Sequence, residues 1–141
     1  MNDESIHYEI VTEVPVNEIV ALYESGHWWE ESPHNREIIP GMIQGSFCFL
    51  LATHQGRPIG MGRVISDGYS DGYIQDLVVK QAYRGQGIGK EIVRRLTHFC
   101  MEKGLDWVGL IAEPNTQTFY EELGFRVLSD DVPMIFEGNP K

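Results

Sequence analysis

Residues 75–90 read Gln-Asp-Leu-Val-Val-Lys-Gln-Ala-Tyr-Arg-Gly-Gln-Gly-Ile-Gly-Lys. A short apolar run, Leu77 to Val79, is typical of a buried strand, and glycines at alternate positions follow it in a turn. Apolar residues then recur at helical spacing, at Ile88, Ile92, Leu96 and Phe99, so the turn leads directly into an amphipathic helix. Glycines let a ligand approach the backbone, and the first amides of a helix have no acceptor within it. The passage therefore predicts a site for a phosphate or pyrophosphate.

The spacing of this turn excludes two better-known glycine motifs. A Walker A loop would need glycine in place of Arg84 and Ser or Thr in place of Glu91. The dinucleotide-binding fingerprint would need its third glycine in place of Lys90, and the chain is short for a doubly wound sheet. A strand-to-helix turn without a ligand stays the plain alternative, although such a turn does not require three glycines.

The remaining chain reads as strands and helices of one domain, residues 1–141, with no linker. Hydrophobic periodicity and turn residues predict, in order, a strand at 6–12, a helix after Pro15 that stops at Gly26, a helix from Ser32-Pro33, strands at 47–51, 59–65 and 73–79, the helix from Ile88 to Lys103-Gly104, a buried strand at 105–112, a short helix at 116–123, and a closing strand pair at 125–128 and 132–136. Pro40 and Gly41 are expected to kink or break the second helix. This order predicts an α/β (α+β) sandwich with a mixed sheet.

Composition narrows the class of protein and its partners. The 141 residues carry a formal net charge of -10, which argues against nucleic acid and favours either simple solubility or a cationic substrate. No apolar run approaches the roughly 18 residues that span a bilayer, and Met1 to Ser5 is polar and acidic, so a cytoplasmic protein without a membrane partner is expected. Cys48 and Cys100 lie in apolar segments without ligand-type spacing, so neither a disulfide nor a metal site is expected.

Three parts of the chain resemble the GNAT acetyltransferases. The pattern Arg84-x-x-Gly87-x-Gly89 resembles motif A of that family, residues 77–79 resemble its fourth strand, and residues 119–125 resemble the end of its motif B. The resemblance covers most of the chain from Gly62 to Phe125. It implies a three-layer α/β/α sandwich whose central mixed, mostly antiparallel sheet is splayed between strands 4 and 5.

The resemblance also implies acetyl-CoA as co-substrate, with no metal. In the family, the amides of the glycine turn bind the pyrophosphate, which places at the cofactor the residues Arg84, Gly85, Gln86, Gly87, Ile88, Gly89 and Lys90. Leu77 and Val79 match the positions that pair with the pantetheine arm, and the Val79 N–H matches the donor to the thioester oxygen. Tyr120 matches the general acid that protonates the departing thiolate. A free phenol has a pKa of about 10, close enough to that of an alkyl thiol for it to donate a proton as charge develops on sulfur. Packing of Tyr120 against neighbouring aromatic rings is the structural alternative.

Two positions depart from the family pattern. Where many relatives have a pantetheine-binding Asn the chain has Glu113, and Asn115 nearby is either its substitute or a turn or capping residue. Where some relatives have a catalytic Glu the chain has Gln75, which cannot accept a proton. Asp76 is then the candidate to hold a cationic amine or to act as a base through water, and a structural role is the alternative.

Residues 27–31, His-Trp-Trp-Glu-Glu, are suited to a cation or an aromatic amine, or else cap the core. Candidate acceptor-binding residues are Trp28, Trp29, Glu31, His34 and Gln75. The expected reaction is direct transfer of an acetyl group from acetyl-CoA to a primary amine of a small molecule or peptide. The alternatives are a non-catalytic acyl-CoA sensor and a protein lysine or N-terminal acetyltransferase. A homodimer is compatible with the sequence.

Overall fold

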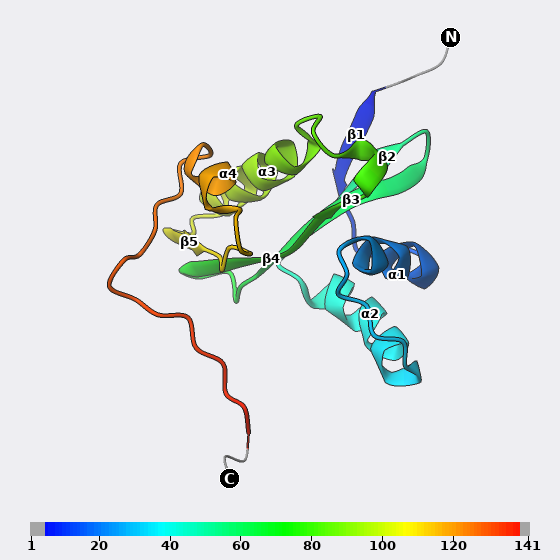
Figure 1. The fold of residues 1–141 in the computed structure, drawn as a ribbon, viewed down its shortest axis with the longest axis horizontal. Coiled ribbons are helices and arrows are strands. Elements are labelled where there is room, and N and C mark those ends of the chain that lie inside the picture. Colours follow the sequence, from blue (N-terminus) through cyan, green and yellow to red (C-terminus); the bar gives the residue numbers. More distant parts are fainter. Residues whose placement is uncertain (1–4, 139–141) are drawn as a thin grey trace. The chain divides into compact units, whose positions relative to one another are not determined.

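The computed structural model describes residues 5–138, and contacts along the chain divide it into two compact units, residues 1–110 and 111–141. The first unit holds nearly all of the regular structure (Figure 1). Its elements are β1 (Ile6–Ile10), α1 (Val16–Ser25), α2 (Pro33–Gly45), β2 (Cys48–His54), β3 (Arg57–Ile65), β4 (Asp71–Val79), the short 3-10 helix η1 (Gln81–Tyr83), α3 (Ile88–Glu102) and β5 (Trp107–Gly109). The second unit contains α4 (Gln117–Glu121).

The sheet of the first unit confirms the predicted mixed α/β fold. Its strands follow the order β1-β2-β3-β4-β5, antiparallel up to β4 and parallel between β4 and β5. Helices α1 and α2 cover one face and α3 covers the other, which gives the three layers (Figure 1). The splay is present as well, because β4 and β5 pair only at Asp71 to Tyr73.

One core lies between the sheet and the first two helices. Its buried members include Leu22 of α1, Ile39 of α2 and Met61 of β3, each at most 1% exposed. Tyr23 is part of this cluster too and brings a hydroxyl group to its edge. The Tyr23 hydroxyl is therefore held in place by a well-packed layer.

On the opposite face, α3 lies very close to β3 because β3 carries glycines there. A Cβ atom placed on Gly62 would lie 2.9 Å from side-chain carbons of both Ile92 and Leu96. A Cβ atom essentially never makes carbon contacts that short, so any larger residue at Gly62 would push α3 outward. The predicted apolar stripe of α3 therefore packs against β3, and the helix begins at Ile88, after η1 and the glycine turn.

The predicted turn signals hold for both N-terminal helices, and a tight hairpin joins β2 to β3. Ser32 caps α2 by accepting from the Asn35 amide at 3.0 Å, and Gly26 follows the end of α1. Gln55 and Gly56, with φ of 52° and 78°, form the two-residue turn between β2 and β3, as type I′ geometry requires.

Three details of the prediction differ from the structure. Helix α2 continues through Pro40, so the break is absent, while a kink at Pro40 and Gly41 stays a prediction. The strand expected at 105–112 is shorter in the structure and consists of the three-residue β5. Among the described residues β5 pairs only with β4, so it is an edge strand. Its Trp107 is 47% exposed rather than buried. The closing pair at 125–128 and 132–136 is absent from the described residues. An isolated two-stranded pair is marginal in water, and Pro133 lacks an N–H for a ladder.

Candidate active site

The glycine turn after η1 presents the start of α3 to solvent. Gly85 and Gly87 have φ of 79° and 81°, values that residues with a Cβ rarely adopt, and Gly87 is the N-cap of α3. The first helical hydrogen bond runs from the Glu91 N–H to the Gly87 carbonyl at 3.1 Å. The amides of Ile88 and Gly89 precede that bond, and the glycine cap has no side chain to accept from them. The helix start is therefore built to receive an external anion.

Arg84 fastens the turn to the rest of the first unit. Its Nε donates to the Val79 carbonyl and its Nη2 donates to the Ser25 carbonyl, both at 2.9 Å. Two of the guanidinium donors thus hold the end of β4 and the end of α1. In this structure Arg84 positions the turn, while Gln86 beside it is exposed.

The second feature of the candidate site is the edge of β4 beyond the residues that pair with β5. The Lys80 N–H donates to the Ile59 carbonyl of β3 at 2.8 Å. Because successive amides of a strand point to opposite sides, the Val79 N–H points away from β3. On that side β5 pairs with β4 only as far as Tyr73. Leu77 has the same orientation as Val79, so this edge can accept an added strand-like ligand.

Asp76 lies in a β-bulge of β4, three residues before Val79. In the β3–β4 ladder Arg63 pairs with Gln75 and Met61 pairs with Val78, so Asp76 and Leu77 together face Gly62. Asp76 has a φ of 59°, which turns the strand and re-aims its side chain. Sequence patterns carry no signal for this bulge.

The Asp76 carboxylate is held by two partners that the sequence analysis missed. Its Oδ2 accepts from the Tyr23 hydroxyl at 2.9 Å and from Arg63 Nε at 2.8 Å. Burial first, and the negative charge of Asp76 second, raise the pKa of Tyr23 above that of a free tyrosine. Both contacts use one oxygen atom, and Oδ1 makes no hydrogen bond within the described part of the chain.

Tyr23→Phe tests this network through stability. Losing the donor should lower the free energy of unfolding at neutral pH by about 1–2 kcal/mol, because a largely buried carboxylate loses a partner. A raised folded-state pKa means that the stabilisation is complete below a pH of about 10 and is lost as the pH rises above it. Urea unfolding across that range should therefore show a steeper alkaline decline in the parent protein than in Tyr23→Phe. Tyr69→Phe, at an exposed ring, is the matched control. Parallel declines in the parent and Tyr23→Phe would contradict the network.

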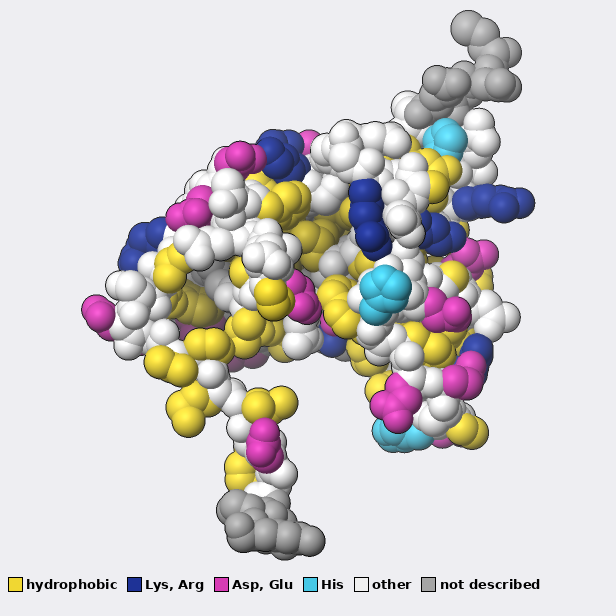
Figure 2. All heavy atoms as spheres, in the orientation of Figure 1, with side chains coloured by type: hydrophobic (Ala, Val, Ile, Leu, Met, Phe, Trp, Pro, Cys, Tyr) yellow, Lys and Arg dark blue, Asp and Glu magenta, His cyan; other side chains and the backbone are white. Residues whose placement is uncertain are grey.

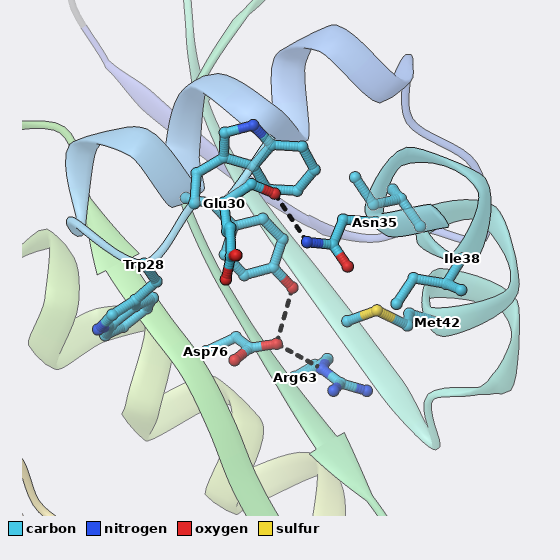
Figure 3. Close-up of a pocket in the computed structure, with 10 residues that line it drawn as sticks. Trp28, Glu30, Asn35, Ile38, Met42, Arg63 and Asp76 are labelled. Carbon is cyan, nitrogen blue, oxygen red and sulfur yellow. Dashed lines mark hydrogen bonds and ion pairs between the residues drawn. The ribbon is translucent and has the colours of Figure 1, made fainter. Parts of the chain in front are cut away.

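A pocket of about 310 Å³ opens beside Asp76, within the first unit (Figure 3). Helix α1, the loop after it, helix α2 and strands β3 and β4 all contribute to its wall. The lining residues are Tyr23, Trp28, Trp29, Glu30, Asn35, Ile38, Ile39, Met42, Arg63 and Asp76. The site thus combines aromatic rings, an apolar helix face and two carboxylates.

Only some of the acceptor candidates lie at this pocket. Trp28 and Trp29 line it, together with Asp76. Glu31 instead makes a bidentate ion pair with Arg36, at 2.7 and 2.8 Å, which lowers the pKa of the Glu31 carboxyl. His34 is exposed on α2 and is not among the lining residues.

Gln75 also lies outside the lining, and its Oε1 accepts from Arg63 Nη2 at 3.1 Å. Glu30 lines the pocket although the adjacent Glu31 was the residue singled out from the sequence. No local pattern separates two neighbouring glutamates, since the turn after α1 decides which of them faces inward.

The second unit carries Tyr120 and Asn115. The Tyr120 ring packs edge-to-face on Phe119 and Phe125, with centroids 4.9 and 5.9 Å apart. Burial, and then the negative charge of Glu113, raise the pKa of Tyr120. Asn115 is a turn residue with a φ of 68°, and Thr116 is the N-cap of α4.

Comparison with known proteins adds family evidence. A family model described as an acetyltransferase (GNAT) domain matches residues 19–138, across both units. Serotonin N-acetyltransferase 2, chloroplastic, of Oryza sativa subsp. japonica is 34% identical over 81 residues, 57% of this chain and 40% of that protein. Glucosamine 6-phosphate N-acetyltransferase of Trypanosoma brucei brucei is 34% identical over 94 residues, 61% of this chain and 60% of that protein.

Solved structures share the fold. A GNAT-family acetyltransferase from Streptococcus pneumoniae TIGR4 superimposes with a TM-score of 0.80 at 24% identity, covering 96% of this chain and 100% of that one. In sequence, the chain spans 60% or less of the two named relatives' own length.

Proposed function

The chain belongs to the GNAT acetyltransferase family, and from that premise we propose that it transfers an acetyl group from acetyl-CoA directly to a primary amine. The observation that carries the proposal is the start of α3, where backbone amides follow a glycine cap. A Cβ atom on Gly87 would meet no other atom within 4 Å, so there is open space at this cap. Amide donors and open space suit the pyrophosphate of coenzyme A. Gly85, Gln86, Gly89 and Lys90 are proposed to flank it, and Arg84 to hold the turn.

The β4 edge would hold the pantetheine arm. Its amides at Leu77 and Val79 point away from β3, and an extended amide-containing chain can pair with them as a further strand would. The Val79 N–H would then donate to the thioester oxygen, which becomes negative as the amine attacks the carbonyl carbon. Asn115, by its family position, is proposed to contact the same arm.

Tyr120 is proposed to complete the transfer. As the carbon–sulfur bond breaks, its hydroxyl gives a proton to sulfur, and the attacking nitrogen loses a proton to solvent or to a nearby base. The phenol is in the protonated, donating form at neutral pH, and burial of the ring keeps it so to higher pH by raising the pKa of Tyr120.

A covalent acyl-enzyme on cysteine is disfavoured by burial. Cys48 and Cys100 are at most 1% exposed, and burial raises the pKa of Cys48 to about 12. Since the thiolate is the nucleophilic form, neither side chain suits attack on a thioester.

Release of free thiol from acetyl-CoA in the presence of a panel of amines and peptides tests the proposal. An acetyltransferase releases thiol in step with acetylated amine. A non-catalytic acyl-CoA sensor would bind coenzyme A but release no thiol with any acceptor, and that result would overturn the proposed reaction.

Asp76→Asn tests how Asp76 serves the acceptor. The carboxylate is pinned by Tyr23 and Arg63 beside the pocket, so we expect it to hold a cationic amine, with KM for the amine rising about 10-fold and kcat changing little. Asp71→Asn, an exposed aspartate at the other end of β4, is the control. An unchanged KM together with a shifted pH profile of kcat would show instead that Asp76 works as a base.

The acceptor is not carried over from the relatives, because their names give different ones, serotonin and glucosamine 6-phosphate. A small-molecule amine is proposed here, because the pocket volume of about 310 Å³ suits a small ligand. No described helix is long and apolar enough to cross a bilayer. A cytoplasmic location, a homodimer and one domain over residues 1–141 stay predictions, and residues 1–4 and 139–141 lie outside the described part.

A further inference from the structure

From the pocket beside β4 we infer that the acceptor is an arylalkylamine, a primary ammonium on a short chain that ends in a flat apolar ring. The inference rests on the proposed function for the acetyl transfer, but the binding preference can be measured without it. The pocket volume, about 310 Å³, lies at the lower end of small-ligand sites, which fits a molecule of this size.

The ring half of this ligand follows from the aromatic wall. Tyr23 and Trp29 stack at 6.1 Å between centroids with 21° between their planes, and Trp28 lies across the pocket from Ile38 and Met42 (Figure 3). Trp28 also has a firm backing, because a Cβ atom on Gly26 would come within 3.1 Å of its indole. The pocket therefore has an aromatic wall and an apolar helix face, surfaces against which a flat apolar ring can pack.

The ammonium half follows from the charges. The Arg63 guanidinium is already paired, since its Nε donates to Asp76 and its Nη2 donates to Gln75. The Glu30 carboxylate makes no ion pair within the described residues, and in Figure 3 it points toward the Asp76 side of the pocket. A cation would meet two carboxylates against one paired guanidinium, whereas an anion would meet net repulsion.

The charges on the elements around the pocket also favour a cation. Residues 16–45, which contain α1, α2 and the loop between them, carry five glutamates and a single arginine. Figure 2 shows acidic side chains gathered over this part of the surface. The local field therefore raises the concentration of cations at the pocket mouth.

The orientation of the ligand also agrees with the proposed chemistry. Asp76 lies on the β4 bulge, three residues before Val79, while the aromatic rings come from α1 and the loop that follows it. A ring held among the aromatic side chains would leave the amine beside the β4 edge.

Calorimetry with four probes tests the inference, both with and without coenzyme A. 2-Phenylethylamine carries both features, n-butylamine lacks the ring, 2-phenylethanol lacks the charge, and glucosamine 6-phosphate is an amine with an anionic group. We expect 2-phenylethylamine to bind at least about 10-fold more tightly than each of the others. Equal or tighter binding of n-butylamine or glucosamine 6-phosphate, or no binding of 2-phenylethylamine, would overturn the inference.

Matched variants locate the binding. Trp28→Ala and Glu30→Gln should each weaken 2-phenylethylamine binding about 10-fold, and only Trp28→Ala should leave n-butylamine unchanged. Glu37→Gln makes the same chemical change at an exposed position on α2 outside the pocket and should have no effect. If neither Trp28→Ala nor Glu30→Gln weakens binding, the ligand lies elsewhere and the inference fails.

Thiol release separates the two proposals. Acetylation of amines without preference for a ring would overturn the arylalkylamine class and leave the proposed function intact. Ring-selective amine binding without thiol release would support the ligand class and overturn the proposed acetyl transfer.

Discussion

Replacing Gly87 by valine is expected to weaken coenzyme A binding about 100-fold, roughly the loss of two charge-assisted hydrogen bonds. Gly87 has a φ of 81° as the cap of α3, and a β-branched residue strongly resists that conformation. Relaxation of the turn would re-aim the amides of Ile88 and Gly89. The new side chain would also fill the open space in which the pyrophosphate is proposed to lie.

Gly104→Val is the matched control for that experiment. Gly104 follows the other end of α3 with a φ of 88°, and its surroundings are equally open. Both variants should lose stability to similar backbone strain, measured by urea unfolding. Only Gly87→Val should lose coenzyme A affinity in calorimetry, and equal losses of affinity in both would show that the effect is strain alone.

Tyr120→Phe is expected to lower kcat about 100-fold, the contribution typical of a positioned general acid, with little change in coenzyme A affinity. The phenylalanine ring can keep the edge-to-face contacts with Phe119 and Phe125, so the fold of the second unit should survive. Stopped-flow or steady-state thiol release gives kcat, and calorimetry gives the affinity.

The pH dependence of kcat gives a second test of the proposed role of Tyr120. Burial and Glu113 raise the pKa of Tyr120, so the acid stays protonated past a pH of about 10, where an exposed tyrosine would ionise. The alkaline decline of kcat in the parent protein should begin above that pH and should be absent from Tyr120→Phe. Tyr69→Phe should behave as the parent protein does. If Tyr120→Phe keeps full turnover at every pH, Tyr120 only packs against its neighbours.

Local patterns were sufficient for the elements that frame the proposed cofactor site. The glycine-rich turn at 85–89, the apolar stripe of α3 and the hairpin at Gln55-Gly56 each depend on residues close in sequence. Their geometry therefore follows from backbone preferences and helical or strand spacing. The family resemblance rests on the same stretch, which is why the fold could be predicted from the sequence.

The pocket proposed for the acceptor could be predicted only in part, because residues distant in sequence shape it. The bulge at Asp76 arises from the offset of β3 and β4 around Gly62, and its carboxylate is held by Tyr23, 53 positions away. Nothing local in the sequence indicates such a pairing. Trp28 and Trp29 were identified by their type, but the loop after α1 determines that Glu30 rather than Glu31 joins them.

The C-terminal prediction failed for a related reason. The apolar residues at 125–128 and 132–136 resemble two strands, yet strands need partners to satisfy their backbone groups. In the described residues neither segment is paired, and Met134 and Phe136 are largely exposed. Residue type alone does not provide a partner.

The most direct measurement compares coenzyme A with pantetheine, which lacks the diphosphate, by calorimetry on the parent protein near neutral pH. If the amides at the start of α3 bind the diphosphate, coenzyme A should bind at least about 100-fold more tightly than pantetheine. Equal affinities, or no binding of coenzyme A at all, would contradict the central claim.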